Sequence, residues 1–264
     1  MGVVNVTPDS FSDGGLFVDR QAAVEQGLAL ASQGAAILDI GGESTRPGSD
    51  PTPLEVELDR VLPVVRELKE RSGALISIDT YKAPVAEAAI AAGADMVNDV
   101  TALKGDPAMA GLCARSGVAL VLMHMLGSPR TMQVDPQYQD VVAEVRDFLA
   151  AQAQVALAAG VDGQAIVVDP GIGFGKTLDH NLALIRNLPA LAALGYPVLL
   201  GASRKAFIGK LTGREQPGER LWGTLGAHAL GAALGADMVR VHDVAPLREA
   251  LQVVDAVMAA PVWP

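Results

Sequence analysis

One arrangement of apolar and polar residues repeats along the chain. A run rich in Ala and Leu with the spacing of a helix ends at a glycine, and a short run of mostly Val, Ile, Leu and Met follows within a few residues. Helices often end at glycine because the residue after the last turn takes a left-handed backbone conformation, which glycine adopts easily. The pattern predicts seven helix-to-strand junctions, at Gly34, Gly73, Gly93, Gly117, Gly160, Gly195 and Gly235.

An eighth strand is predicted at residues 2–6 and a closing helix at residues 246–259. The strands are nearly continuous apolar runs, as is typical of a parallel sheet covered by helices. Eight strand–helix units in about 260 residues fit a TIM barrel. We therefore predict an α/β fold, a single (β/α)8 TIM barrel, with residues 1–264 as one domain. The alternative, an open doubly wound sheet, usually carries G-x-G-x-x-G after its first strand, where this chain has NVTPDS.

Polar side chains follow every predicted strand, whereas the strand beginnings are bland. In a TIM barrel the carboxyl ends of the strands meet on one face, where the active site lies. Contact with water would explain polar residues at two or three strand ends, but polar residues at all eight favour a shared pocket. In chain order they are Asn5, segment 43–46, Asp79, Asn98 with Asp99, His124, Asp169, segment 203–205, and Arg240 with His242 and Asp243.

These side chains fall into two chemical groups. Carboxylates and amides suit a neutral heterocycle, since a carboxylate accepts two parallel hydrogen bonds from an amidine-like edge. Basic side chains gathered on an acidic protein suit a phosphate or carboxylate ligand. The first group is Asp79, Asn98 and Asp169; the second is Arg46, Arg204, Lys205, Arg240 and His242, with Asn5, Thr45 and Ser203 as neutral contacts.

Two loops, residues 7–15 and 41–50, are rich in Gly, Ser, Asp and Pro, and each follows a strand. Loops of this kind close over substrates in many enzymes. Asp9 and Asp13 lie beside Asn5 in the sequence, and Mg²⁺ prefers such oxygen ligands together with a substrate phosphate. Asp also favours turns, so both interpretations of the two aspartates stay open.

Charge and composition exclude several classes of function. The formal charge of −10 leaves no basic footprint for nucleic acid. The longest stretch without charged residues, 187–203, is interrupted by Pro189, Gly195 and Pro197, so no membrane span is predicted, and the N-terminus lacks the features of a signal peptide. The lone cysteine, Cys113, cannot form an internal disulfide and indicates a cytoplasmic protein.

Several catalytic motifs fail on inspection. GIGFGKT at residues 171–177 resembles a phosphate-binding loop, but Pro170 stands where its first glycine should be. The four histidines lack zinc spacing, and packing in a helix explains both His228 and Cys113. No G-x-S-x-G nucleophile motif is present. Covalent catalysis is therefore not supported.

Eight segments stand in this order along the chain: NVTPDSFSDGG, DIGGESTRPGS, SIDTYK, NDV, MHMLGSPRTMQ, DPGIGFGKT, SRKAFIG and RVHDV. Together they resemble the dihydropteroate synthase family over essentially the whole chain, and the first two segments are highly specific. The resemblance implies a TIM barrel that condenses 6-hydroxymethyl-7,8-dihydropterin diphosphate with 4-aminobenzoate. The products would be 7,8-dihydropteroate and pyrophosphate, with Mg²⁺ as cofactor and sulfonamides as inhibitors that mimic 4-aminobenzoate.

The resemblance also implies roles for individual residues. The pterin would bind Asp79, Asn98, Asp169 and Lys205, with Arg240 stacked on the ring and near the diphosphate. The anion site would include Asn5, Thr45, Arg46 and His242, with Asn5 close to Mg²⁺. Phe11, Asp13, Pro47, Phe174 and Ser203 match positions that shape or close the aminobenzoate pocket. The residues expected to be catalytic are Asp13, Arg46, Lys205, Arg240 and His242.

One departure and two rivals qualify the resemblance. Family members usually carry a segment before NVTPDS that closes the bottom of the barrel, and here four residues precede Asn5. A pterin-binding methyltransferase acting on a corrinoid would not need the two loops or the anion cluster. A silent pterin-binding paralogue would have lost Arg46, Lys205, Arg240 or His242. The resemblance further implies a homodimer through the C-terminal helices, where the small residues of segment 225–237 permit close packing.

Overall fold

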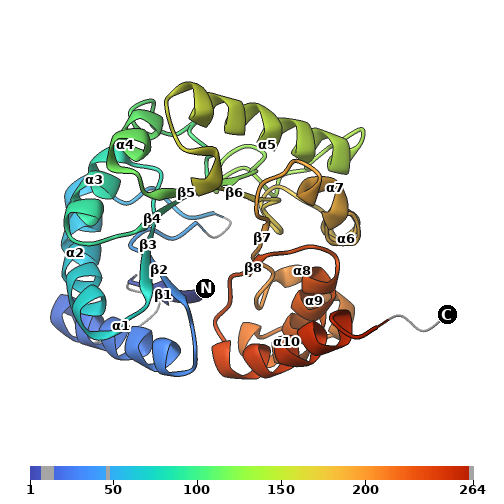
Figure 1. Ribbon diagram of the computed structural model, residues 1–264. Helices are drawn as coiled ribbons and strands as arrows, with labels where there is room; N and C mark the ends of the chain where they lie inside the picture. The colour runs from blue at the N-terminus through green and yellow to red at the C-terminus, as the bar shows by residue number, and fades with distance from the viewer. Residues whose placement is uncertain (7–14, 46–47, 262–264) are drawn as a thin grey trace.

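The structure, a computed structural model, describes residues 1–6, 15–45 and 48–261 and arranges their strands in a ring with helices outside it (Figure 1). The strands are β1 (Gly2–Asn5), β2 (Ile37–Gly41), β3 (Leu75–Asp79), β4 (Met96–Asp99), β5 (Ala119–Met123), β6 (Ile166–Asp169), β7 (Leu199–Leu200) and β8 (Met238–Val239). The helices are α1 (Gly15–Ser32), α2 (Leu54–Arg71), α3 (Ala83–Ala91), α4 (Met109–Ser116), α5 (Val141–Ala158), α6 (Leu178–Arg186), α7 (Leu188–Ala192), α8 (Ala206–Thr212), α9 (Leu221–Ala233) and α10 (Val244–Met258), with 3-10 turns η2 (Gly163–Ala165) and η3 (Pro217–Glu219).

Parallel pairing runs around the whole ring. Strands β1 to β6 form one sheet in sequence order, and β7 pairs with β8. Two bridges join these parts, Val168 with Val198 and Gly2 with Val241. At the second seam the Val3 N–H donates to the Val241 carbonyl at 3.0 Å. The predicted (β/α)8 barrel is confirmed, and β1 closes it against the end of β8.

The glycine pattern identified the helix-to-strand junctions correctly. All seven predicted glycines have φ between 66° and 113°, the left-handed region that favours glycine. The prediction of one helix after each strand was too simple in two places. Two helices, α6 and α7, connect β6 to β7, because Pro189 stands in the first turn of a new helix. Likewise, α8 ends at the left-handed Gly213 before α9 begins.

The core has two layers, which follow from the alternation of side chains along each strand. Side chains that point outward pack against the helices in one large cluster that includes Leu38, Ile76 and Leu120. A smaller cluster belongs to the other face of the strands, inside the ring: Ile37, Met96, Val121, Val167 and Leu199. These residues fill the amino-terminal half of the barrel, so a pocket can open only at the carboxyl ends of the strands.

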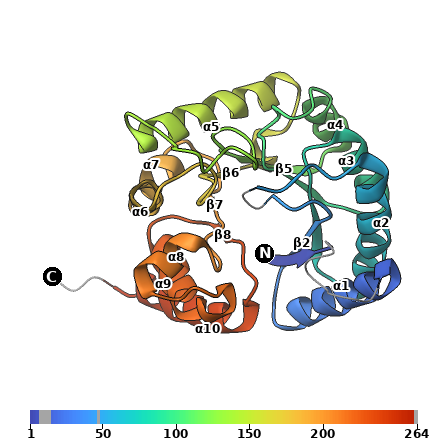
Figure 2. The same cartoon turned by 180° about the vertical axis from the view of Figure 1, so that it is seen from behind.

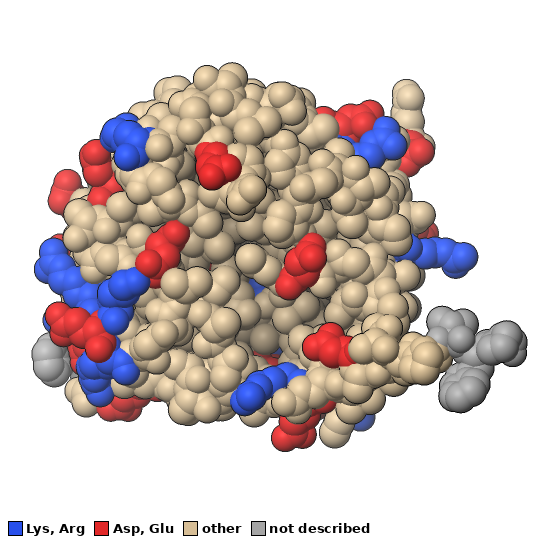
Figure 3. All heavy atoms as spheres, viewed as in Figure 1, with Lys and Arg blue, Asp and Glu red and all other residues tan. Residues whose placement is uncertain are grey.

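The helices surround the ring of strands, and the view from behind in Figure 2 shows the same arrangement. On the face drawn in Figure 3, acidic and basic side chains are intermingled and form no single basic field among the described residues. Within the described part of the chain, no helix combines the length and apolar character needed to cross a membrane.

Candidate active site at the carboxyl ends of the strands

The strand pattern itself delivers polar side chains to the pocket. Residues two apart on a strand point to the same side, so a polar residue two positions after an inner-cluster residue also points into the barrel. Three pocket residues arise in this way. The pairs are Met96 and Asn98, Val167 and Asp169, and Met238 and Arg240.

One pocket collects nine of the side chains predicted for the site. It opens at the carboxyl ends of β2 to β8, and Val100, Met123 and Gly201 complete its wall. Asp169 and Lys205 therefore lie in the same pocket as Arg240 and His242, as the expectation of one shared site requires. The nine are Thr45, Asp79, Asn98, Asp169, Phe174, Ser203, Lys205, Arg240 and His242.

Arg240 holds two carboxylates at the pocket floor. Its Nε donates to Asp39 Oδ2 at 2.6 Å and its Nη2 donates to Asp79 Oδ2 at 2.8 Å. The Asp39 side chain is fully buried, and its Oδ2 also accepts from Asn98 Nδ2 at 3.0 Å. One cation thus faces two acids, which gives the floor an excess of negative charge suited to N–H donors.

Burial and neighbouring charge set the protonation of this floor. Burial, reinforced by the charge of Asp39 and opposed by Arg240, raises the pKa of Asp79 to about 7. Arg240 stays charged: burial acts against its charge, but Asp39 and Asp79 outweigh it and raise its pKa further. Asn98 gives one amide hydrogen to Asp39 and keeps a second N–H and its carbonyl oxygen for other partners.

Asp169 and Lys205 form the opposite wall. Asp169 Oδ1 accepts from the Gly171 N–H at 2.7 Å, and Gly171 has φ of 66°. A Cβ on Gly171 would lie 1.9 Å from the carbonyl oxygen of His124, so this turn requires glycine. Burial raises the pKa of Asp169, against the lowering effect of the Gly171 N–H and then of Lys205.

Lys205 links this wall to an aromatic side chain. Its ammonium donates to the carbonyl of Ile172 and lies 4.1 Å from the centre of the Phe174 ring. Burial lowers the pKa of Lys205 to about 8, although Asp169 partly offsets that effect. A buried ammonium beside an aromatic ring suits the edge of a planar heterocycle.

Behind this wall, Lys176 and His124 form a buried pair. Lys176 Nζ lies 3.0 Å from His124 Nδ1 and donates to the carbonyl of Phe174 at 2.9 Å. Burial lowers the pKa of Lys176 to about 7 and that of His124 to about 3. His124 packs edge-on against Phe148 rather than lining the pocket. The GFGKT segment therefore uses its lysine to support the turn that carries Phe174.

Ser203 and His242, which both line the pocket, form a polar contact with each other. Ser203 Oγ lies 3.0 Å from His242 Nδ1 and accepts from the His242 backbone N–H at 3.2 Å. Their strand ends are held from behind by His228, which is fully buried, as expected, and whose Nε2 accepts from the Ala202 N–H at 3.2 Å. Burial lowers the pKa of His228 to about 4, so this histidine is a neutral acceptor.

Two polar strand-end residues have structural roles instead of the ones expected. Arg204, expected to suit an anion, points to Asp243 and donates to its carboxylate through Nε at 2.9 Å. Its backbone has φ of 57°, which turns its side chain away from the pocket that Ser203 and Lys205 line. Asp99 accepts from the N–H groups of Thr101 and Leu103 at 2.8 and 2.7 Å and so fixes the turn after β4.

The other predicted residues lie outside the pocket lining or outside the part of the chain that the structure describes. Asn5 is half-buried at the end of β1, beside Gly41 in register, but is not among the described residues that line the pocket. Phe11, Asp13, Arg46 and Pro47 lie outside the described residues, as does Asp9. Their expected roles stay predictions.

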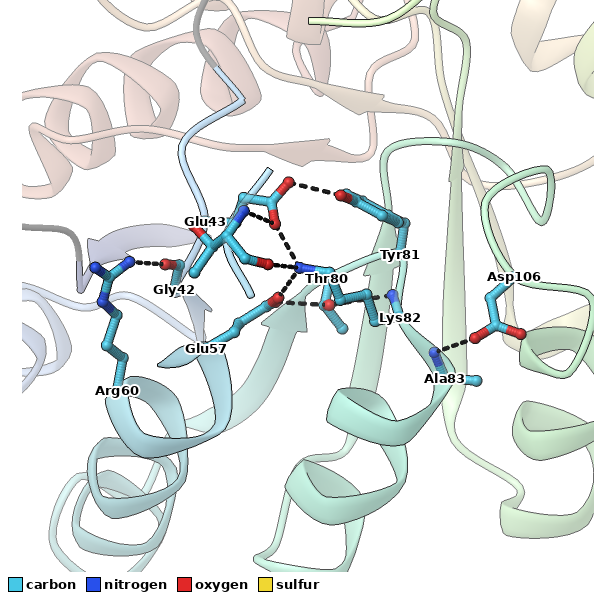
Figure 4. Close-up of polar contacts among 10 residues, drawn as sticks. Gly42, Glu43, Glu57, Arg60, Thr80, Tyr81, Lys82, Ala83 and Asp106 are labelled. Carbon is cyan, nitrogen blue, oxygen red and sulfur yellow. Dashed lines mark hydrogen bonds and ion pairs between the residues drawn. The ribbon is translucent and has the colours of Figure 1, made fainter. Parts of the chain in front are cut away.

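A second cavity of about 300 Å³, open to solvent, adjoins the pocket through Val100. One side of it is the segment that follows β2, and the other side is formed by residues after β3, β4 and β5, including Tyr81, Lys104 and Met125. At the base of the cavity Glu43 accepts from the Tyr81 hydroxyl at 2.8 Å (Figure 4). In the segment after β2, Ser44, Ser49 and Pro51 therefore face this cavity.

Sequence reasoning missed Asp39 and the support given by Lys176. The signal for Asp39 was present: an aspartate stands in the middle of the apolar strand ILDIG, two residues after the inner-cluster residue Ile37. A charged residue on the inner face of a barrel strand needs a buried partner. Lys176 was considered only as part of a phosphate-binding loop, and its burial, with 3% exposure, is visible only in the fold.

Known proteins match the chain over nearly its whole length. A family described as pterin binding enzyme matches residues 1–242. The dihydropteroate synthase of Mycobacterium leprae is 51% identical over 97% of this chain and 92% of that protein. The Xanthomonas albilineans dihydropteroate synthase solved with 4-aminobenzoic acid superposes with a TM-score of 0.94 at 51% identity, covering 99% of this chain and 93% of that one.

Two further structures extend the match to product and drug complexes. The Xanthomonas albilineans enzyme in complex with 7,8-dihydropteroate has a TM-score of 0.90 at 48% identity, over 99% of this chain and 94% of that one. The Yersinia pestis enzyme with a sulfonamide drug has a TM-score of 0.93 at 40% identity, over 98% of this chain and 94% of that one. These likenesses confirm the resemblance found in the sequence, and the chain belongs to the dihydropteroate synthase family of pterin-binding enzymes, transferases of folate biosynthesis.

Proposed function

We propose that this pocket joins 6-hydroxymethyl-7,8-dihydropterin diphosphate to 4-aminobenzoate and releases pyrophosphate. The observation that carries the proposal is the convergence of nine expected side chains on one pocket, with acids on its floor and hydroxyl, imidazole and guanidinium groups beside them. Family membership and the relatives solved with 4-aminobenzoic acid and 7,8-dihydropteroate support the same assignment.

The pterin binds at the floor, between Asp79 and Asp169. Its amino group and ring N–H face Asp169, whose oxygens are buried and fixed by Gly171. Lys205 and the free N–H of Asn98 face the acceptor side of the ring. The planar Arg240 guanidinium is held in place by hydrogen bonds to two carboxylates. It stacks on the pterin ring and reaches toward the diphosphate.

The diphosphate lies above the pterin, where Thr45, His242 and Arg240 present donors. Arg46 belongs to this anion site by family resemblance. 4-Aminobenzoate enters beside Phe174 and Ser203, and the family resemblance implies that Phe11, Asp13 and Pro47 shape or close its pocket. A sulfonamide, which mimics 4-aminobenzoate, competes for the same place; the Yersinia pestis relative was solved with such a drug.

The residues at this rim fit Mg²⁺ that arrives with the substrate rather than a resident metal centre. Among the described residues, no cluster of three or more His, Cys, Asp or Glu could hold a metal. Mg²⁺ commonly uses one or two protein oxygens together with substrate phosphates and water. The side-chain oxygen of Asn5 would supply the protein contact. When bound, the ion neutralises charge on the leaving diphosphate.

The chain's own residues then assist one substitution. The bond that breaks joins the pterin CH₂ to a diphosphate oxygen, and the bond that forms joins that carbon to the amine nitrogen, which releases a proton. Arg240 and His242 stabilise the departing negative charge. The electron-rich dihydropterin spreads the positive charge on the carbon, so the reaction needs no enzyme nucleophile. Closure of the two loops, as the family resemblance implies, would keep out water, which otherwise competes with the weakly basic amine.

Pyrophosphate release tests the proposal against its rivals. The wild-type protein with both substrates and Mg²⁺ should release pyrophosphate, and a sulfonamide should inhibit in competition with 4-aminobenzoate. A corrinoid methyltransferase or a silent pterin-binding protein would release none.

Asp169→Ala should weaken pterin binding by about 10- to 100-fold in calorimetry, the range for hydrogen bonds to a charged group. Asp162→Ala, which removes only an exposed turn contact, is the matched control; equal pterin affinity in both variants would refute the site.

Two expectations about the cellular form accompany this proposal. The cytoplasmic location stays a prediction; Cys113 is buried at 1% exposure, and burial raises the pKa of its thiol to about 12.

The homodimer is proposed to form through α8, α9 and α10. The small residues of segment 225–237 do not provide that surface alone, because a Cβ on Gly231 would lie 2.2 Å from Leu200, on the barrel side of α9.

A further inference from the structure

We infer that Lys82 is a positioning residue of the reaction, which holds the segment from Glu43 to Thr52 in the place from which Thr45 reaches the substrate anion. The inference rests on the proposed function for what Thr45 contacts. It concerns a lysine that lies outside the pocket and is assigned no role by the chemistry described above.

Lys82 binds both ends of this segment with one ammonium group. Its Nζ lies 2.5 Å from Glu43 Oε2, at the start of the segment, and donates to the carbonyl of Thr52, at its end, at 2.7 Å. The Thr52 N–H also donates to Glu43 Oε2 at 2.9 Å. The two ends of this loop, Glu43 and Thr52, are thereby brought together on Lys82.

A second carboxylate holds the ammonium from below. Lys82 Nζ lies 2.5 Å from Glu57 Oε2, and Glu57 Oε1 accepts from the Thr80 hydroxyl at 2.8 Å (Figure 4). The side chains of Glu57, Glu43 and Lys82 are only 1%, 7% and 18% exposed. Removing one partner of an ion pair buried this deeply strongly destabilises the folded protein. The remaining charge is then left without water and without an ion partner.

The backbone of Lys82 is fixed as firmly as its side chain. Its N–H donates to Thr80 Oγ1 at 3.2 Å, and the N–H of Ala83, the first residue of α3, donates to Asp106 Oδ2 at 3.0 Å. Asp79, three residues before Lys82, is bound to Arg240 in the pocket floor. A single short turn after β3 therefore sets both the pterin floor and the base of the loop.

Among the described residues of the loop, further contacts lie away from Lys82, and one of them joins Ser44 Oγ to Ser49 Oγ at 3.0 Å. At its tip the Gly48 N–H donates to the Pro129 carbonyl at 2.9 Å, and Asp50 pairs with Arg130 at 3.4 Å. That ion pair is 67% and 77% exposed, and such pairs contribute little. The loop also lines one side of the open cavity of about 300 Å³. Among the ion pairs that hold the described residues of the loop, those at its base are therefore the buried ones.

The test compares Lys82→Met with Lys69→Met, which removes a lysine–aspartate pair at the opposite end of the barrel. In Lys82→Met, we expect the amides of residues 43–52 to exchange hydrogen about tenfold faster. We expect kcat/KM for the dihydropterin diphosphate to fall about 100-fold, since small displacements of contacting groups have effects of this size. Binding of 6-hydroxymethylpterin without diphosphate should stay within about twofold of wild type.

Two more variants separate positioning from folding. Lys82→Met with Glu57→Gln removes the excess negative charge, so it should recover stability while kcat/KM stays low and exchange stays fast. Lys82→Arg, which keeps the charge and the donors, should recover part of kcat/KM.

Unchanged exchange in Lys82→Met, parallel loss of 6-hydroxymethylpterin binding, or recovery of kcat/KM by the Glu57→Gln change would overturn the inference. If the wild-type protein released no pyrophosphate, the proposed function would fail instead, whereas the exchange result would still decide whether Lys82 holds the loop.

Discussion

Arg240 and Asp39, 201 residues apart in the chain, are joined by a hydrogen bond of 2.6 Å at the centre of the barrel. The same guanidinium reaches Asp79, so one residue binds the acids of two neighbouring strands. The residue expected to stack on the substrate is therefore also part of the core. Its substitution should affect catalysis and stability together, and the two effects can be separated.

Arg240→Met should abolish turnover and lower the free energy of unfolding by about 3 kcal/mol. The stability loss is at the low end of the range for broken buried pairs, because Arg240 is 23% exposed while Asp39 is fully buried. The double variant Arg240→Met with Asp39→Asn removes the orphaned charge and should recover most of the stability but no turnover. Urea unfolding measures the stability and pyrophosphate release measures the turnover. If the double variant were no more stable than Arg240→Met, the ion pair with Asp39 would not be the way in which Arg240 stabilises the fold.

Pterin affinity should depend on pH in a bell shape with limbs near 7 and 8. Asp79, whose pKa burial raises to about 7, must lose its proton before its carboxylate can accept from the pterin, so affinity rises with pH up to that value. Lys205, whose pKa burial lowers to about 8, must keep its proton to donate, so affinity falls above that value. Each limb should approach about tenfold per pH unit.

Calorimetry from pH 5.5 to 9.5 checks the assignment of each limb. Asp79→Asn should remove the acid limb and Lys205→Met the basic one. A basic limb that persists in Lys205→Met belongs to the ligand and not to the protein.

Asn5→Ala should raise the Mg²⁺ concentration that gives half the maximal rate by on the order of tenfold, since one oxygen ligand among several is lost. The maximal rate at saturating Mg²⁺ should change less, because the diphosphate supplies the other oxygens. Asn187→Ala, at an exposed position that caps a helix carbonyl, is the control. Identical Mg²⁺ curves for wild type, Asn5→Ala and the control would remove Asn5 from the metal site.

The protein should sediment at twice its chain mass of 27.2 kDa. Exposed apolar side chains gather on the adjacent helices α9 and α10, including Trp222 at 79%, Leu230 at 53% and Val257 at 65% exposure. Leu230→Glu with Val257→Glu should give a monomer, whereas Val155→Glu on α5 should not. A wild-type mass of one chain, or a dimer that survives the double change, would contradict this interface.

The sequence was enough to predict which strand ends form the pocket. It was not enough to predict which individual side chains make which contacts there. Ser203, Arg204 and Lys205 are consecutive and polar, and nothing in their order distinguishes them. The left-handed backbone at Arg204 sends its side chain to Asp243 and leaves its neighbours in the pocket. Similarly, His124 was a reasonable pocket residue until burial against Lys176 and Phe148 gave it a supporting role.

The sequence by itself determined the repeating unit and the face that carries the chemistry. Glycines at the ends of helices and alternating side chains on strands act over a few residues, so the eight strands and the polar strand ends could be found from local pattern. Only the tertiary structure decided which charges meet. Pairing of Arg240 with Asp39, and of Lys82 with Glu43 and Glu57, depends on closure of the ring, on register and on burial, and these relate residues far apart in the chain.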